Sequence, residues 1–421
     1  MQLGLRLGFS AVGIADIALE REAEGFQAWI AADHHGEMEY MARHGSKRWQ
    51  PDELQPGTQS VICVALDYWP SKVDHSPTQS PLPPGGRARD AATSLASSIA
   101  ESPLPLGGRA RERVDANAIL PAVSVGLDSR LADDPSNSTR PTPTRREATK
   151  PFADAAEALD DPERAYISRY ALGRDYHKVL RNKLQSFAEA INTQIAAHQF
   201  RVFTDSAPVM EIPLAVKAGL GWRGKHTLLL NRERGSMFFL GEIYTSLQLA
   251  PPAAQNEHCG TCTACIDVCP TQAIIGPHRL DARKCISYLT IELKSAIPVE
   301  FRKAMGNRIY GCDDCQLVCP WNKFAQRTPI PDFEPRNGLD SATLVELFAW
   351  TEADFNQRLQ GSPIRRIGHE RWLRNIAVAL GNAPTSASVN QALQLRAGHS
   401  SELVREHVAW AMAEQQSLRP D

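Results

Sequence analysis

The chain has 421 residues, of which 43% are hydrophobic and 22% charged, a composition typical of a globular protein with two to four domains. The formal net charge of −2 excludes an overall basic field for nucleic acid, so any polyanion site has to be a local basic patch. We expect no membrane span, because no run of about 18 apolar residues occurs, and no signal peptide, because the N-terminal stretch lacks a basic region and a cleavage site.

Residues 1–74 predict part of an α/β layer. The stretches "SAVGIADI" (10–17) and "QSVICVALDYW" (59–69) are short β-branched runs preceded by turn residues, which is typical of buried strands. Cys63 lies inside the second run, so we expect it to be a buried small hydrophobic residue.

Residues 75–162 differ in composition from the rest of the chain. "SPLPPGGRAR" (80–89) recurs as "SPLPLGGRAR" (102–111) among Ser, Pro, Ala and charged residues. Such a segment buries too little apolar surface to order itself, so we predict a disordered insertion. The alternative is a basic arm that contacts nucleic acid through Arg87, Arg89, Arg109, Arg111 and Arg113.

Residues 163–250 return to regular patterns. A long amphipathic helix is predicted after Gly173-Arg174-Asp175. The stretch from "FRVFTDSAP" (200–208) onward then predicts a strand, a loop, a helix, a Gly-rich turn and two further strands. Residues 1–74 and 163–250 together therefore predict one α/β domain that the insertion interrupts.

Eight of the nine cysteines lie between Cys259 and Cys319. A secreted disulfide scaffold would spread its cysteines along a short chain, whereas this clustering indicates metal binding in a reducing compartment. We therefore predict a cytoplasmic protein.

The cysteine spacing predicts two [4Fe–4S] clusters in a ferredoxin-type domain at 251–330. The first set is Cys259-x2-Cys262-x2-Cys265-x3-Cys269-Pro270, and the second is Cys285 followed by Cys312-x2-Cys315-x3-Cys319-Pro320. In two-cluster ferredoxins the cysteine before the proline binds the other cluster. One cluster is thus assigned to Cys259, Cys262, Cys265 and Cys319, and the other to Cys269, Cys285, Cys312 and Cys315. Two structural zinc sites are the less suitable alternative, because a dense triple followed by Cys-Pro differs from paired zinc knuckles.

Residues 331–421 predict short amphipathic helices separated by polar turns, as in "LVELFAW" (344–350) and "ELVREHVAWAMAEQ" (402–415). This pattern favours stacked helix pairs of the HEAT kind, although a plain helical bundle has the same signature. The whole chain is thus predicted as a multi-domain α+β protein.

Several separate motifs, in one order, resemble the epoxyqueuosine reductases. They are "GRDYHKVLRNKL" (173–184), "TDSAPVMEIPLAVKAGLGWRGKHTLLL" (204–230), "YGCDDCQLVCPWN" (310–322) and "RRIGHERWLRNIAVALGN" (365–382), together with the ferredoxin set. The resemblance covers nearly the whole chain except 75–162. It implies a dehalogenase-like α/β domain that binds cobalamin, two [4Fe–4S] clusters, and a helical domain that helps to bind tRNA. It also implies a reaction, the two-electron removal of the epoxide oxygen from epoxyqueuosine at the wobble position.

The resemblance also implies site residues. Asp205 matches the family's proton donor. Because such an acid has to be protonated when it acts, we expect it to be partly buried with a raised pKa. Without the family, a turn or N-cap role would explain Asp205 as well. The expected cobalamin contacts are Arg48, Ser168, Asp205, Leu229, Leu240, Ser287 and Asp313, although the two leucines would also suit an ordinary core. Asp175 and His177 either belong to this family motif or only cap the long helix.

One position departs from the family pattern, which usually has Asn after "GK". Here His226 stands at that position. An imidazole could be an axial ligand of cobalt, but we expect a cobalamin without one.

For tRNA, the basic run Arg365, Arg366, Arg371 and Arg374 predicts salt-sensitive phosphate contact, with a solvated helix face as the alternative. The modified base has to be unstacked to react. We further expect a low-potential electron donor and a monomer. The alternative functions are a cobalamin-dependent small-molecule reductase of the dehalogenase type and a non-enzymatic iron–sulfur electron carrier.

Overall fold

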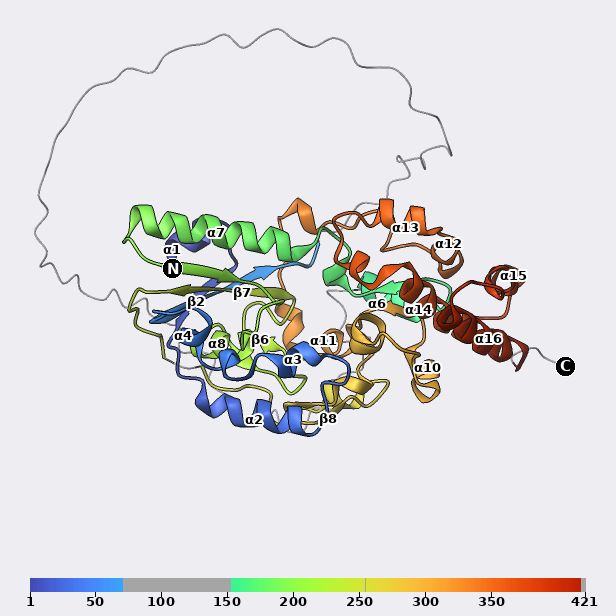
Figure 1. Ribbon diagram of the computed structural model, residues 1–421, viewed down its shortest axis with the longest axis horizontal. Coiled ribbons are helices and arrows are strands. Elements are labelled where there is room, and N and C mark those ends of the chain that lie inside the picture. The colour runs from blue at the N-terminus through green and yellow to red at the C-terminus, as the bar shows by residue number, and fades with distance from the viewer. Residues whose placement is uncertain (71–152, 254, 418–421) are drawn as a thin grey trace, which may run out of the picture. The chain divides into compact units, whose positions relative to one another are not determined.

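The computed structural model describes residues 1–70, 153–253 and 255–417 (Figure 1). Its helices are α1 (Gln2–Arg6), α2 (Glu20–Ala31), α3 (Glu39–Arg43), α4 (Pro51–Leu54), α6 (Ala153–Asp160), α7 (Tyr176–Gln194), α8 (Glu211–Lys217), α9 (Ala264–Asp267), α10 (Val299–Met305), α11 (Asp314–Leu317), α12 (Leu344–Phe348), α13 (Glu352–Arg358), α14 (Gly368–Asn382), α15 (Ala387–Arg396) and α16 (Glu402–Ser417). Its strands are β1 (Ala11–Ala15), β2 (Ser60–Asp67), β3 (Tyr166–Ile167), β4 (Phe200–Phe203), β5 (Trp222–Arg223), β6 (Leu229–Leu230), β7 (Phe238–Thr245), β8 (Ile274–Gly276), β9 (Arg279–Leu280) and β10 (Arg308–Tyr310).

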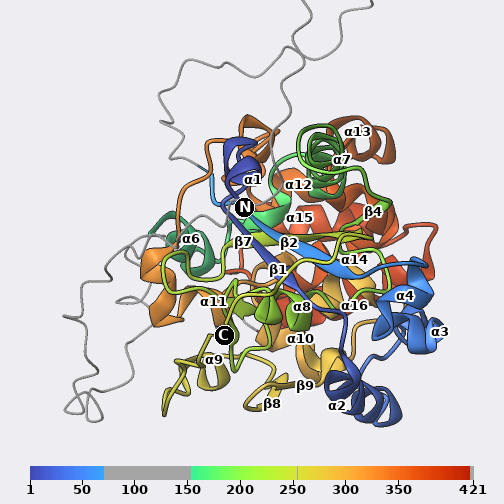
Figure 2. The ribbon, with the colours of Figure 1, turned by 90° about the vertical axis from the view of Figure 1, so that its left-hand side faces the viewer.

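The main sheet is antiparallel, in the order β1-β2-β7-β4, so it takes strands from both sides of the predicted insertion. In β2, Ile62, Val64 and Leu66 face the core under α1 and α7, while Val61, Cys63 and Ala65 face the core under α8. Figures 1 and 2 both show α7 and α8 on opposite sides of this sheet. The predicted strands at 10–17 and 59–69 and the burial of Cys63 are therefore confirmed.

The long helix α7 begins where the sequence predicted it. Asp175 is its N-cap and accepts a hydrogen bond from the main-chain N–H of His177. A buried stripe that includes Leu180, Leu184 and Phe187 packs on the sheet. Gly241 of β7 permits this close approach, because a Cβ there would lie 2.8 Å from Cδ1 of Leu184.

The predicted insertion lies mostly outside the described residues, and so do the five arginines of its proposed basic arm. Its predicted end at residue 162 is wrong. Residues 153–160 form α6, where Ala155, Ala158 and Leu159 are buried in the core that also contains α7. The Ala-rich sequence of α6 is close in composition to the low-complexity sequence before it, so composition alone places the end of the insertion too late.

The C-terminal helices share a core with earlier parts of the chain. Leu347, Trp372 and Leu380 belong to the same buried cluster as Ile167 and Ile309, which lie on the small parallel pair β3–β10. Helix α14 is buried on all sides from Trp372 to Gly381, and it packs against α10, α12 and α16. None of the described helices is long and apolar enough to cross a membrane.

Candidate active site and iron–sulfur ligands

A cavity of about 420 Å³ lies between the main sheet and the cysteine segment. One wall is apolar and includes Leu229, Phe238, Phe239 and Leu240. Asp205 and Glu211 lie on this wall too, whereas Cys269, Cys285, Cys312 and Cys315 line the cavity from the cysteine segment. The cavity therefore brings carboxylates and thiols, far apart in the sequence, to one site.

Asp205 lies in the loop between β4 and α8, with a left-handed φ of 40°. Its main-chain N–H donates to Oε1 of Glu211 at 2.7 Å, which holds the loop against the start of α8. Its Oδ2 accepts a hydrogen bond from the Tyr176 hydroxyl and lies 3.1 Å from Nε2 of His177. Tyr176 is itself fixed by stacking on Phe239, with ring centroids 4.2 Å apart.

The protonation of this group differs from the expectation. Desolvation in the cleft alone would raise the pKa of Asp205, but hydrogen bonds from His177 and Tyr176 outweigh it, so its pKa is lowered. The predicted raised pKa is therefore wrong for this structure. The side chain is 53% exposed, which agrees with the expected partial burial.

The raised pKa belongs to the carboxyl groups behind Asp205. Burial and the Asp205 charge raise the pKa of Glu211 to about 8. Glu242 of β7 is fully buried, and its pKa is raised well above the ordinary value by burial and then by Glu211. Neither carboxyl oxygen of Glu242 has a hydrogen-bond partner among the described residues. These shifts favour the neutral acid form of both glutamates. The sequence alone does not mark either residue, because an isolated Glu carries no motif.

The eight clustered cysteines form two groups of close electrostatic neighbours. Cys259, Cys262 and Cys265 act on Cys319. Cys269 acts on Cys285, and both of these act on Cys315, which in turn acts on Cys312. These electrostatic influences follow the grouping of the crossing rule except for one between the groups, from Cys265 on Cys315, and the assignment of cluster ligands stays a prediction. Cys259 and Cys319 lie beside Trp222 and Trp321, whereas Cys262 and Cys265 pack in one cluster with Cys269 and Cys315. All four cysteines of the second group line the cavity.

Most of the residues expected at a cofactor line the cavity. They are Ser168, Asp205, Leu229, Leu240, Ser287 and Asp313. Buried Asp313 accepts hydrogen bonds from the Tyr166 and Ser168 hydroxyls and from the main-chain N–H of Arg169, which fixes this part of the wall. Arg48 lies elsewhere: its buried guanidinium donates to the carbonyl oxygens of Tyr40 and Met41, so it does not line the cavity.

His226 also lines the cavity, and it is 3% exposed. Its Nδ1 accepts the main-chain N–H of Leu228, so the proton of the neutral ring is on Nε2. Burial lowers the pKa of His226 to about 4, which keeps the ring neutral. Nε2 has no hydrogen-bond partner among the described residues. This orphaned donor suits a large cofactor with amide or phosphate oxygens, and in this tautomer it has no free lone pair for cobalt.

The four arginines of the expected tRNA site do not act alike. Arg365 is exposed, and Arg366 pairs with Asp175 at the start of α7. Arg371 is partly exposed and donates to the carbonyl oxygens of Ile291, Arg366 and Ile367. These three lie where solvent or a ligand can reach at least part of the side chain.

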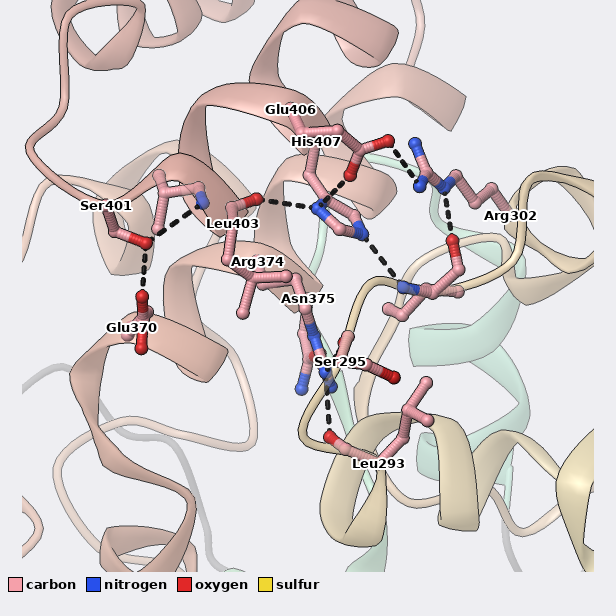
Figure 3. Close-up of polar contacts among 12 residues, drawn as sticks. Leu293, Ser295, Arg302, Glu370, Arg374, Asn375, Ser401, Leu403, Glu406 and His407 are labelled. Carbon is pink, nitrogen blue, oxygen red and sulfur yellow. Dashed lines mark hydrogen bonds and ion pairs between the residues drawn. The ribbon is translucent and has the colours of Figure 1, made fainter. Parts of the chain in front are cut away.

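Arg374 cannot reach a phosphate, so that prediction is wrong. Its side chain is 0% exposed and donates to the carbonyl oxygens of Leu289, Leu293 and Ser295. Figure 3 shows the contact with Leu293. Burial lowers the pKa of Arg374 to about 9. It joins α14 to the segment after Cys285, close to the contact of Arg302 with Glu406 of α16. Arg374 follows Arg371 by about one helical turn, so the sequence alone predicts that both side chains lie on one exposed face of α14.

Comparison with known proteins adds two family matches. A family model described as "4Fe-4S double cluster binding domain" matches residues 258–322, and one described as "Epoxyqueuosine reductase QueG, DUF1730" matches residues 146–206. The epoxyqueuosine reductases of Pseudomonas aeruginosa and Xanthomonas campestris are 47% and 48% identical to this chain. These alignments cover 97% and 98% of this chain and 91% and 94% of the relatives.

Solved structures share the fold. A crystal structure of epoxyqueuosine reductase with an epoxyqueuosine-modified tRNA-Tyr stem loop has a TM-score of 0.72 at 24% identity, and covers 98% of this chain and 88% of that one. The enzyme of Bacillus subtilis, with an aspartate-bearing catalytic loop swung out of its active site, has a TM-score of 0.71 at 24% identity and the same coverage.

A double-cluster module joined to a mixed helix and sheet domain, with a carboxylate facing the thiols, defines an iron–sulfur oxidoreductase. The identity to curated relatives, over nearly the full length of both chains, is more specific. The chain belongs to the epoxyqueuosine reductase family. The resemblance inferred from the motifs and the preference for iron–sulfur clusters over zinc are both confirmed.

Proposed function

We propose that this chain reduces epoxyqueuosine in tRNA to queuosine, with Asp205 delivering a proton at the epoxide oxygen. The observation that carries the proposal is a single cavity lined both by Asp205 and by the four cysteines of one predicted cluster. The balance is two electrons and two protons taken up per epoxide, with the oxygen released as water. Relatives that carry the name epoxyqueuosine reductase do not favour the small-molecule reductase or the electron carrier.

The cavity suits a cobalamin. Ser168, Leu229, Leu240, Ser287 and Asp313 would hold it, and the orphaned Nε2–H of His226 would donate to one of its polar groups. Cobalamin, when bound, supplies a strongly reducing metal centre for opening the C–O bond. The protein residues orient the bound substrate, exclude water with an apolar wall, and place an acid near the leaving oxygen.

The positions of the two cysteine groups support an order for electron transfer. The group of Cys269, Cys285, Cys312 and Cys315 would hold the cluster next to the reaction, because these residues line the cavity. The group around Cys259 and Cys319 lies away from the cavity, next to Trp321, and would receive electrons from a low-potential one-electron carrier. Electrons would then pass from that outer cluster to the inner one.

The C-terminal helices are proposed to bind tRNA, in a HEAT-like arrangement. Exposed Arg365 and the accessible parts of Arg366 and Arg371 are the phosphate contacts, and Arg366 lies next to the residues that hold Asp205. The modified base leaves its stack to enter the cavity. We further propose that the protein acts as a monomer in the cytoplasm.

The test is anaerobic reconstitution with iron, sulfide and cobalamin, followed by reduction and incubation with tRNA from cells that cannot complete queuosine. Mass spectrometry of the nucleosides should show the loss of one oxygen, and omission of cobalamin should abolish it. Unchanged tRNA in the presence of a fully loaded, reduced protein would refute the proposal.

A further inference from the structure

His177 lies between two carboxylates. Its Nδ1 is 2.9 Å from Oδ1 of Asp175 and 3.0 Å from Nη2 of Arg366, and its Nε2 is 3.1 Å from Oδ2 of Asp205. The imidazole side chain is 15% exposed. A ring with a carboxylate at each nitrogen donates two hydrogen bonds only when both nitrogens carry protons, that is, as the imidazolium.

The charges around His177 favour that form. Burial, together with Arg366, would lower the pKa of His177, but hydrogen bonds to Asp175 and Asp205 outweigh them and raise it. Burial would raise the pKa of Asp175, but hydrogen bonds from His177 and Arg366 outweigh it and lower this pKa to about 2. These shifts favour a triad of Asp175, His177 and Asp205 in which the titratable proton is on the His177 ring and both aspartates are ionised.

This arrangement bears on the reaction, because Asp205 is ionised at rest and cannot donate a proton that it does not hold. Among the described residues, the cavity wall includes Asp205 but not His177. We propose, on the basis of the proposed function, that His177 stores the proton for epoxide opening and that Asp205 passes it on.

The proton and the electron pair are balanced in this step. The Nε2 proton of His177 first moves to Oδ2 of Asp205, which makes Asp205 a neutral acid. As the C–O bond breaks, its electron pair remains on oxygen, and Asp205 gives this proton to that oxygen and returns to the carboxylate. The two electrons of the overall reduction come from the carrier through the clusters. His177, now neutral, regains its proton from solvent, which reaches the exposed side of Asp205. The proton that His177 regains is the second one of the overall reduction, and it protonates the hydroxyl group that leaves as water.

Several other titratable or charged groups act on this triad. They are Tyr176 on the same helix, Glu211 on α8, Glu242 on β7 behind it, Arg366 before α14, and Tyr40 and Glu292, which act on Asp205. Burial favours the neutral form of Glu211 and Glu242, and Glu211, with a pKa raised to about 8, loses its proton mainly above neutral pH. The titration expected within the triad itself is therefore that of His177.

The first test places the proton without relying on catalysis. In holoprotein with oxidised clusters, labelled with 13C at the histidine Cε1 position, His177→Asn identifies its resonance among those of the 12 histidines. We expect His177 to titrate above pH 6.5, and Asp175→Asn to move the midpoint to lower pH while retaining the helix cap. A midpoint at or below 6.5 in the wild-type protein would overturn the inference.

The second test is the pH profile of single-turnover reduction of epoxyqueuosine tRNA. The wild-type rate should fall as pH rises through the His177 titration. Asp175→Asn should shift that fall to lower pH, and His177→Asn should remove it while lowering the rate at pH 6.5 by about 100-fold. A merely structural histidine would lower the rate in His177→Asn without changing the profile. A wild-type chain inactive on this tRNA would instead count against the proposed function, and the titration would still decide where the proton lies.

Discussion

Asp205, Glu211 and Glu242 form a line of carboxyl groups from the cavity into the sheet, and their different surroundings give them different charges. Asp205 is hydrogen-bonded to His177 and Tyr176, which favours the carboxylate. Burial and the neighbouring negative charge favour the neutral acid in both Glu211 and Glu242. A single negative charge is thus concentrated on the residue that faces the cavity.

Glu211→Gln tests this assignment through stability. The folded-state pKa of about 8 lies above the ordinary value of 4.5, so wild-type folding stability is lost as pH rises between these values. Glutamine keeps the acceptor for the N–H of Asp205 but does not titrate. Its stability relative to wild type should therefore rise by up to about 1.4 kcal/mol per pH unit over this interval. Thermal unfolding at pH 5, 7 and 9, with equal cluster content, measures the difference. The exposed Glu189→Gln of α7 is the control, and equal pH dependence in all three proteins would contradict the assignment.

Individual site residues were predictable to the extent that a motif marked them. The expected positions of Ser168 and Asp313 on one wall agree with their mutual hydrogen bond. The role of Arg374 could not be predicted, because an arginine that binds carbonyl oxygens inside the protein has the same sequence signature as one that binds phosphate. The contact of Tyr176 with Asp205 depends on how α7 lies on the sheet, although the motif "GRDYH" had already marked the segment.

Helix α14 connects the C-terminal helices to the inner cluster. Arg374 donates to three carbonyl oxygens around the turn at Tyr288–Glu292, and Asn375 donates to the carbonyl oxygens of Thr290 and Ile309. This turn begins three residues after Cys285, so α14 fixes the segment that supplies one proposed ligand of the inner iron–sulfur cluster. The helix thus has a structural role in its buried part and is available to tRNA only near its exposed start.

Arg374→Met and Arg365→Met should separate these two roles. The first leaves three carbonyl oxygens without this donor, so we expect a loss of at least about 3 kcal/mol in unfolding free energy, together with lower iron content. The second should leave stability unchanged, weaken tRNA binding and reduce the dependence of log Kd on log salt by about one. Thermal unfolding, iron analysis and tRNA titration at several salt concentrations measure these effects. Loss of tRNA affinity in a fully loaded, stable Arg374→Met protein would contradict the assignment.

The elements with clear periodicity were predictable, including β1, β2 and α7, because alternation and an amphipathic stripe need no tertiary information. Helix α6 was not predictable: "ADAAEALD" has few large apolar residues, and it forms a helix here by burying small side chains against the core. The assignment of the C-terminal helices to repeats stays a prediction, since their shared core with β3 and β10 depends on long-range packing.

At the scale of the whole molecule, the proposed crossed pairing of the cysteines predicts which variants lose the same cluster. Cys319→Ser should abolish the same cluster as Cys262→Ser, although the two residues lie in different sequence sets, while Cys312→Ser should abolish the other. Iron content should fall by about half in each variant, and electron paramagnetic resonance of the reduced proteins identifies the lost cluster. If Cys319→Ser lost the same signal as Cys312→Ser, the crossed assignment would be wrong.

The measurement that tests the central claim most directly is the amount of queuosine formed in one turnover by wild-type and Asp205→Asn proteins. Both would carry two clusters and cobalamin, both would be reduced, and both would receive tRNA with epoxyqueuosine. We predict nearly complete conversion by the wild-type protein and a rate about 100-fold lower for Asp205→Asn, with cofactor content unchanged. Equal rates would remove Asp205 from the reaction, and no conversion by the fully loaded wild-type protein would contradict the account as a whole.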